Sequence, residues 1–396
     1  MANQSLVRHI NERRLLTILR VGGAFPRAEL ARRLSLTRAS VTGMIQDLLA
    51  RGLVREMATH DDVATRRDAG RPGIAIALDP SGAHFLGVEI GVGVLRFALL
   101  DLAAGIAETE ALPLARGTSP HAVVALIASK LASLQQNPLY RQSIRALGVT
   151  VPGLVRSDGH VINLPILGWK DVNLAEPIAA AIDLPCHVEN NANAAAFGHI
   201  YSDPRPRHGV VVYLKIGNGC GGAVVIDDKL LRGNNGLGTE FGHLRIASDG
   251  PLCSCGQRGC LETFVNLRAL QRYATNKDVD EAAADPGLPE KVAALLAAGD
   301  AGAEAAVATL AGHLAQGLID ITNIFNPDEV VIGGTMLPIL DAVLDRARPL
   351  TARGIVPGMT MPLLTISRIG AFECAIGAAA LAHHEAFDLA NLDLRA

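Results

Sequence analysis

Apolar and polar residues alternate at helical spacing along the first part of the chain. Residues 6–20 carry arginines on one side and an apolar stripe on the other, which predicts an amphipathic helix; the stripe consists of Ile10, Leu15, Ile18 and Leu19. A second helix is expected to start at Pro26. Thr37 is the expected N-cap of a third helix that ends at Gly52. The pattern therefore predicts three short helices in succession.

The predicted third helix presents two unlike faces. Its buried face is expected to consist of Val41, Ile45, Leu48 and Leu49. The other face is polar and has no acidic residue at its start, and its candidate DNA-contacting residues are Thr37, Arg38, Ser40, Thr42 and Gln46. Two short helices joined by a tight turn are typical of a helix-turn-helix, whose second helix enters the major groove of DNA. The alternative is a helical interaction module with a solvated basic face.

Two short stretches, LVRE at residues 53–56 and GRPGIAIAL at residues 70–78, flank a polar loop that contains Arg66 and Arg67. They predict two strands and a wing. Arg71 lies at the end of this loop between a glycine and a proline, and this resembles the extended segments that place an arginine in an A·T-rich minor groove. Residues 1–80 are therefore predicted to form a winged helix-turn-helix domain that binds operator DNA.

Charge is divided unevenly along the chain. Residues 1–75 hold thirteen arginines against seven acidic residues, a net charge of +6, so the total of −3 leaves −9 for the remainder. A basic module joined to an acidic body favours a polyanion as the partner of the first part alone.

Length and composition limit the classes of protein. A chain of 396 residues with 49% hydrophobic and 19% charged residues is long enough for two or three domains with sizeable cores. No uncharged apolar run approaches the roughly 20 residues of a membrane span. The first residues contain no apolar signal core. We therefore expect a globular, cytoplasmic protein with reduced thiols.

The body of the chain contains the same outline twice. Residues 84–102 and 209–231 each consist of an apolar strand, a glycine turn, a second apolar strand and an aspartate. This repeat predicts a duplicated α/β body, residues 81–396, with a cleft between two lobes. A third glycine turn follows an apolar strand at residues 329–336. Three such turns at one cleft would suit nucleotide phosphates, although hairpin geometry explains glycines of this kind equally well.

Three cysteines lie within eight positions in the segment CSCGQRGCLE, residues 253–262. A reducing compartment disfavours a disulfide, and zinc prefers four thiolate or imidazole ligands at the corners of a tetrahedron. A histidine lies ten residues upstream, and Gly256 and Gly259 supply the positive φ that a tight ligand loop requires. The spacing predicts a closed structural zinc site with the ligands His243, Cys253, Cys255 and Cys260. Metal-free packed thiols are the alternative.

Five segments resemble, in this order, the ROK family of repressors, open reading frames and kinases: ENNANAAAFG, GNGCGG, GTEFGHLRI, CSCGQRGCLE and NPDEVVIGG. With the winged helix in front, the chain is similar to the sugar-responsive transcriptional regulators of that family. The resemblance implies an actin-like, ribonuclease H-like ATPase-type fold and the same four zinc ligands. It also implies a sugar pocket formed by Gly153, Asn190, Asn191, Glu240, His243 and Glu262.

The chain departs from the family pattern at positions that serve catalysis. The family's kinases use the third residue of a Glu-Asn-Asp motif as general base, and Asn191 stands there in this chain. An amide nitrogen has no basic lone pair and cannot accept a proton. The first phosphate loop lacks the family's threonine and reads Glu89, Ile90, Gly91, Val92 and Gly93, while Asn218 and Cys220 change the second loop. We therefore expect a protein without catalytic residues.

The sequence thus predicts a transcriptional regulator, and specifically a repressor of carbohydrate genes that a sugar or sugar phosphate releases from its operator. A homodimer or homotetramer on a palindromic operator is expected. One alternative is a ROK sugar kinase with an appended DNA-binding domain. Another is a regulator controlled by a membrane sugar-transporter protein, which the resemblance implies for some relatives.

Overall fold

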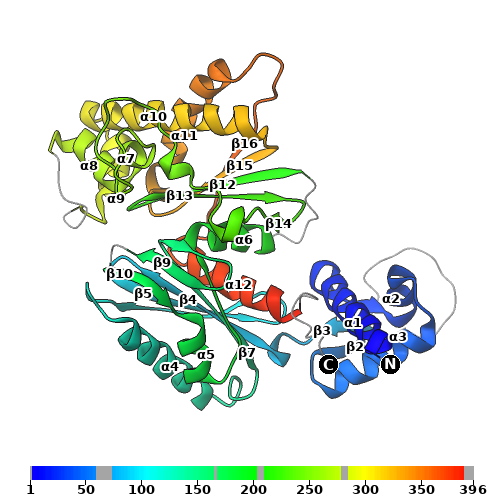
Figure 1. Ribbon diagram of the computed structural model, residues 1–396. Coiled ribbons are helices and arrows are strands. Elements are labelled where there is room, and N and C mark those ends of the chain that lie inside the picture. Colours follow the sequence, from blue (N-terminus) through cyan, green and yellow to red (C-terminus); the bar gives the residue numbers. More distant parts are fainter. Residues whose placement is uncertain (1, 59–73, 165–166, 203–208, 278–283, 388–396) are drawn as a thin grey trace.

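The computed structural model describes residues 2–58, 74–164, 167–202, 209–277 and 284–387. It consists of a winged helix and two α/β lobes, which meet around the helices α6 (Asn191–Ser202) and α12 (Glu373–Phe387) (Figure 1). Each lobe contains a five-stranded sheet. Among the residues described, no single helix is both long and apolar enough to cross a membrane.

The N-terminal part folds as three helices and a three-stranded sheet. The helices are α1 (Ala2–Gly22), α2 (Arg27–Leu34) and α3 (Arg38–Ala50), and the sheet has the order β1 (Phe25–Pro26), β3 (Ile74–Leu78), β2 (Val54–Ala58). α3 begins where the sequence predicts, because the Thr37 hydroxyl accepts a hydrogen bond from Ser40 N at 3.2 Å. Arg71 and the rest of the predicted wing, residues 59–73, lie outside the described residues.

The buried face of α3 differs from the prediction at one edge. Val41, Ile45 and Leu48 are buried as expected, but Met44 completes the face and Leu49 is only half-buried. At 3.6 residues per turn, Met44 and Leu49 lie equally far beyond opposite edges of the stripe that the other three residues define, so the buried face of α3 is turned toward the Met44 side.

The winged helix and the first lobe share one hydrophobic core. Leu15, Leu30 and Ile45 of the winged helix belong to the same cluster of buried residues as Phe85 and Leu102 of the lobe. The predicted domain boundary at residue 80 coincides with a 3₁₀ turn, Pro80–Gly82. The boundary stays a prediction, and the two units pack tightly against each other beside it.

The first lobe is built on a sheet with the strand order β6-β5-β4-β7-β11. Its strands are β4 (His84–Gly91), β5 (Val94–Asp101), β6 (Ile106–Pro113), β7 (Ile144–Val151) and β11 (Cys186–Asn190). Helices α4 (Pro120–Gln136) and α5 (Ala175–Ile182) share an apolar cluster with one face, and α12 packs on the other. β4 is buried along its whole length because both faces are covered. A small sheet extends the lobe and consists of β8 (Leu154–Val155), β9 (His160–Leu164) and β10 (Trp169–Asn173).

The second lobe repeats this topology with the order β14-β13-β12-β15-β16. Its strands are β12 (Val210–Ile216), β13 (Cys220–Ile226), β14 (Lys229–Leu230), β15 (Glu329–Gly333) and β16 (Leu363–Ile366). In both sheets three strands pair antiparallel and the next two pair parallel. The helices of the second lobe are α7 (Glu262–Val265), α8 (Leu267–Thr275), α9 (Leu288–Ala297), α10 (Ala301–Phe325) and α11 (Leu337–Gly354). The duplicated α/β body that the sequence predicts is confirmed.

Helices α6 and α12 lie between the two sheets (Figure 1). α12 packs on β4, β5 and β7 of the first lobe, α6 packs on β12 and β13 of the second, and the helices pack on each other. Glycines permit this close approach. A Cβ on Gly377 of α12 would lie 1.9 Å from Ala194 O of α6, and a Cβ on Gly87 of β4 would lie 1.9 Å from Ala375 O of α12.

Candidate functional site

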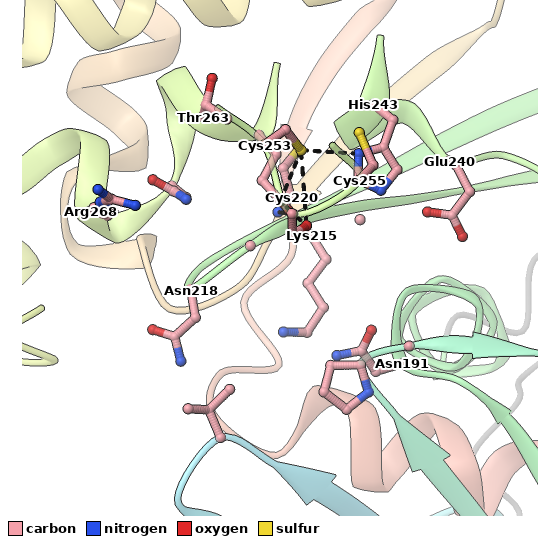
Figure 2. Close-up of a pocket in the computed structure, with 18 of the residues that line it drawn as sticks. Asn191, Lys215, Asn218, Cys220, Glu240, His243, Cys253, Cys255, Thr263 and Arg268 are labelled. Carbon is pink, nitrogen blue, oxygen red and sulfur yellow. Dashed lines mark hydrogen bonds between the residues drawn. The ribbon is translucent and has the colours of Figure 1, made fainter. Parts of the chain in front are cut away.

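A cavity of about 390 Å³ opens between the two lobes. The first lobe contributes residues at the ends of β4, β7 and β11, and the second lobe contributes β12, the turn after it and the cysteine loop (Figure 2). The structure brings together at this cavity all the residues predicted to form a sugar pocket: Gly153, Asn190, Asn191, Glu240, His243 and Glu262. Their contact with a sugar stays a prediction.

The two asparagines at the start of α6 have different roles. The Asn190 amide is held in place, because Nδ2 donates to Gly153 O at 2.9 Å and Oδ1 accepts from Ala192 N at 2.7 Å. Asn190 therefore caps α6 and shapes the cavity wall. No hydrogen bond within the described part of the chain uses the Asn191 amide, which lies at the cavity in Figure 2. This amide can donate to a hydroxyl or accept from one, but it cannot remove the hydroxyl's proton.

Two carboxylates face the cavity from the second lobe. Glu262 Oε2 accepts from Cys220 N at 3.1 Å, and Oε1 accepts from the Ser254 hydroxyl at 3.4 Å. The side chain of Glu240 lines the cavity and is exposed. Partial burial of its carboxyl group raises its pKa, and the neighbouring His243 opposes this effect. Carboxylate oxygens accept hydrogen bonds from more than one hydroxyl at a time, which suits a polyol.

Two cations that the sequence analysis missed, Lys215 and Arg96, line the cavity. Lys215 Nζ is 3.8 Å from one oxygen of Glu373, and the Tyr213 hydroxyl donates to the other at 2.9 Å. Glu89 forms an ion pair with Arg96 at 3.1 Å. Burial raises the pKa of Glu373, and Lys215 opposes this effect. The sequence signal for Lys215 was a single cation inside the apolar run VVVYLKIG.

The predicted metal ligands also converge. The donor atoms of His243, Cys253, Cys255 and Cys260 all lie within 4.8 Å of one another. His243 Nδ1 is 3.4 Å from Cys253 Sγ, and the Sγ atoms of Cys255 and Cys260 are 3.7 Å apart. Around a tetrahedral zinc ion, bonds of about 2.0–2.3 Å place ligand atoms roughly 3.6–3.8 Å apart. These four residues can therefore hold a metal ion.

Local geometry explains the shape of the cysteine loop. Gly256 and Gly259 adopt φ angles of 87° and 79°, as the sequence predicts. A Cβ on Gly259 would also lie 1.8 Å from Ala247 O. An antiparallel bridge pairs Arg245 with Cys260 and closes the loop. Glu262, the first residue of α7, comes two residues after Cys260. The cysteine loop therefore fixes the position of Glu262 in the cavity wall.

The candidate DNA-contacting residues of α3 differ in availability. Thr37, Arg38, Ser40 and Gln46 are exposed, and Thr42 is half-buried. The hydroxyls of Thr37 and Ser40 are hydrogen-bonded to each other at 2.9 Å, and the Thr42 hydroxyl donates to Arg38 O at 2.8 Å. Within the described residues, no hydrogen bond or ion pair uses the side chains of Arg38 and Gln46, which leaves their polar groups available for an external partner.

The chain matches models of two protein families. The MarR family model matches residues 10–63, which include the later part of α1 and the whole of α2 and α3. The ROK family model matches residues 85–385, which is more than half of the chain. The chain belongs to the ROK family.

Relatives of this ROK protein include repressors and kinases. The xylose repressor of Bacillus subtilis is 26% identical over 349 residues, which cover 88% of each chain. The glucokinase of Streptomyces coelicolor is 33% identical over 319 residues, which cover 75% of this chain and 96% of the glucokinase. A solved ROK family transcriptional regulator, a homologue of the E. coli MLC protein, superposes with a TM-score of 0.80 at 24% identity. It covers 97% of this chain, so its fold extends over the winged helix as well as the body.

We predict that the protein purified without added metal carries one metal ion per chain. Cys255→Ser removes one of the four donors and should reduce the metal content several-fold. Cys186→Ser is the matched control, because Cys186 lies in β11 and outside the cluster of four donors. The measurement is elemental analysis of monodisperse protein. Folded wild-type protein with no stoichiometric metal would show that the four residues pack as free thiols and imidazole.

Proposed function

We propose that this ROK protein is a sugar-responsive transcriptional repressor of genes for carbohydrate uptake or catabolism. The observation that carries the proposal is the fusion of a winged helix to a polar cleft in which Asn191 takes the place of a general base. Similarity to the xylose repressor over 88% of the chain supports it. The winged helix would supply operator affinity, and a sugar in the cleft would supply the signal.

Helix α3 is the proposed recognition helix. Arginine and glutamine side chains form paired hydrogen bonds to guanine and adenine, respectively, in the major groove, and Arg38 and Gln46 have their polar groups available for this. Arg71 would enter the minor groove. Thr37, Ser40 and Thr42 would contact the DNA beside the start of α3. Half-sites recur on successive helical turns of DNA, so we propose a homodimer or homotetramer on a palindromic operator.

The role of α3 is tested on an operator that the full chain selects from random DNA duplexes. We predict that Gln46→Ala weakens operator binding by about 1–3 kcal/mol and relaxes the preference at one base pair, because one base contact is lost. Gln142→Ala, at an exposed glutamine of the first lobe, should bind as the wild type does. Fluorescence anisotropy gives the affinities. Unchanged affinity and unchanged base preference in Gln46→Ala would show that α3 is not the recognition helix.

The proposed effector is a sugar or sugar phosphate bound between the lobes. Asn191, Glu240 and Glu262 offer hydrogen bonds to its hydroxyl groups, and the wall is completed by Gly153, Asn190 and His243. A ligand shifts the protein away from DNA only if it prefers the lobe arrangement that is incompatible with paired half-sites. Because the cavity has walls from both lobes, a bound sugar would favour their closure.

We propose that the metal is zinc and that its role is structural. Thiolate and imidazole donors suit zinc, and four protein ligands leave no open position for a catalytic water. The ion would hold in place the loop that leads to Glu262. Reduced thiols fit the cytoplasm as the proposed compartment.

The central test compares operator affinity with and without sugar. A thermal-shift screen with D-xylose, D-glucose and glucose 6-phosphate identifies a ligand, since a hundredfold excess over its Kd stabilises the fold by about 2.7 kcal/mol. We predict that saturating ligand weakens operator binding by about 5- to 150-fold. Glu240→Gln should bind operator normally and respond only to much more sugar, whereas Glu290→Gln, at an exposed site on α9, should respond as the wild type does.

If sugar binds and operator affinity does not change, direct induction is wrong. Control by a partner, such as a membrane sugar-transporter protein, is then the better explanation. Fluorescence anisotropy at fixed salt is required, because phosphate contacts make the affinity strongly dependent on ionic strength.

The alternative function is a sugar kinase with an appended DNA-binding domain, which the 33% identity to a glucokinase favours. We predict that the protein does not phosphorylate D-glucose or D-xylose, because a positioned general base contributes about 10²–10⁴ in rate. Asn191→Asp alone should stay inactive, since the loop at residues 89–93 also lacks the family's threonine. A coupled assay of ADP release with a glucokinase as positive control measures this. Robust turnover by the wild type would establish the alternative.

A further inference from the structure

Helix α6 lies at the cavity with its first residue and contacts α1 of the winged helix with its last turn. It begins with Asn191 at the cavity and extends for about 18 Å at 1.5 Å per residue. Tyr201 in its last turn contacts α1, because Arg20 Nη1 donates to Tyr201 O at 3.1 Å. The Arg20 guanidinium also lies over the Tyr201 ring, 4.0 Å from its centroid. One helix therefore contacts both the candidate sugar site and the DNA-binding unit.

A histidine of α12 holds Tyr201 from another side. His383 Nε2 is 3.0 Å from Leu102 O, and His383 Nδ1 is hydrogen-bonded to the Tyr201 hydroxyl. A carbonyl can only accept, so Nε2 carries the proton and Nδ1 accepts from the hydroxyl. Burial lowers the pKa of His383 to about 4, and the ring is therefore neutral at pH 7.

A second element runs from the cavity to the same histidine. Val94 and Arg96 of β5 line the cavity, and the strand ends at Asp101, next to Leu102. α6 and β5 thus start at one cavity and end on either side of His383. Movement of α6 relative to the first sheet would change the contacts around this ring.

Helix α6 is packed on two sides that belong to different lobes. On one side, a Cβ on Gly198 would lie 2.7 Å from Gly377 Cα of α12, so the two backbones touch. On the other side, α6 shares an apolar cluster with the second sheet, formed by Ala195, Ala196, Ile200, Val211 and Ala223. A change in the angle between the lobes therefore acts directly on α6.

We propose that Arg20 and Tyr201 are positioning residues that couple sugar binding to operator release. The inference rests on the proposed function, since it names the contact through which the same cavity controls DNA binding. Closure of the lobes around a sugar moves α6 against the first sheet, and Tyr201 carries this movement to Arg20 and α1. The spacing of paired recognition helices then no longer fits successive turns of the DNA.

The test measures the coupling ratio, which is the Kd for operator at saturating sugar divided by the Kd without sugar. The probes are the selected operator and whichever of D-xylose, D-glucose and glucose 6-phosphate the thermal-shift screen identifies. Tyr201→Phe removes only the hydroxyl, and Arg20→Met removes the guanidinium. In both variants we expect operator and sugar each to bind alone within about threefold of the wild type, while the coupling ratio falls toward 1. Arg20→Lys keeps the charge over the ring and should retain part of the ratio.

Two matched controls remove the same groups elsewhere. Arg14→Met takes the same charge from an exposed position on α1, and Tyr140→Phe takes a hydroxyl from the first lobe. Both should keep the wild-type ratio, which separates the contact from a general loss of charge or of a buried hydroxyl.

Three results would overturn the inference. A wild-type ratio in both Tyr201→Phe and Arg20→Met refutes it and leaves the proposed function intact. Loss of operator binding without sugar in both variants shows that the contact only keeps the winged helix in place. A ratio of 1 in the wild type removes the proposed function and the inference with it.

Discussion

Contact between two glycines of the first sheet and the backbone of α12 holds the three parts of this protein together. A Cβ on Gly148 would lie 2.0 Å from Ala378 O, a separation that no side chain tolerates, and Gly87 makes an equally close approach. Helix α12 therefore lies close enough to the first sheet to contact the second lobe at one end and α6 at the other. Its first residue, Glu373, bonds to the second lobe, and His383 near its other end bonds to α6 beside the winged helix. A larger residue at either glycine would lift the helix and loosen these contacts together.

The features that the sequence predicted well are those that depend on neighbouring residues. The Thr37 cap, the repeated strand and glycine-turn outline and the cysteine loop with its positive-φ glycines all follow from short-range spacing. Family motifs then located the cavity, since four of the five contribute residues to its lining and the fifth ends next to Thr335, which also lines it. Within α3, the prediction chose Leu49 over Met44 because apolar spacing alone does not show where the partner helices lie.

The features that the sequence did not reveal depend on residues that are far apart in the chain. Arg20 and Tyr201 are separated by 181 positions, and Tyr213 and Glu373 by 160. Such pairs form through tertiary packing, about which periodicity carries no information. The same limit applies to Asn190, because only the structure shows that Gly153 and the start of α6 already use its amide.

The cleft combines a kinase-like fold with chemistry that suits binding. Its cation Lys215 is paired with Glu373, and Arg96 is paired with Glu89. These two cations therefore keep their partners when a neutral polyol enters. Asn191 adds hydrogen-bonding capacity at the position where a transferase needs basicity. In the proposed function no chemical step uses the binding energy of a sugar, and that energy is then available to change the relation between the lobes.

The position of α12 also bears on how the chain is made. Chains leave the ribosome N-terminus first, and domains generally fold in that order. Here the first sheet has one face uncovered, and the winged-helix core lacks Ala382, until residues 373–387 have been synthesised. Native packing of the DNA-binding unit is consequently completed only after residues 373–387 have emerged. A partly translated chain therefore has an incompletely packed DNA-binding unit. The uncovered apolar face of its first sheet can bind chaperones.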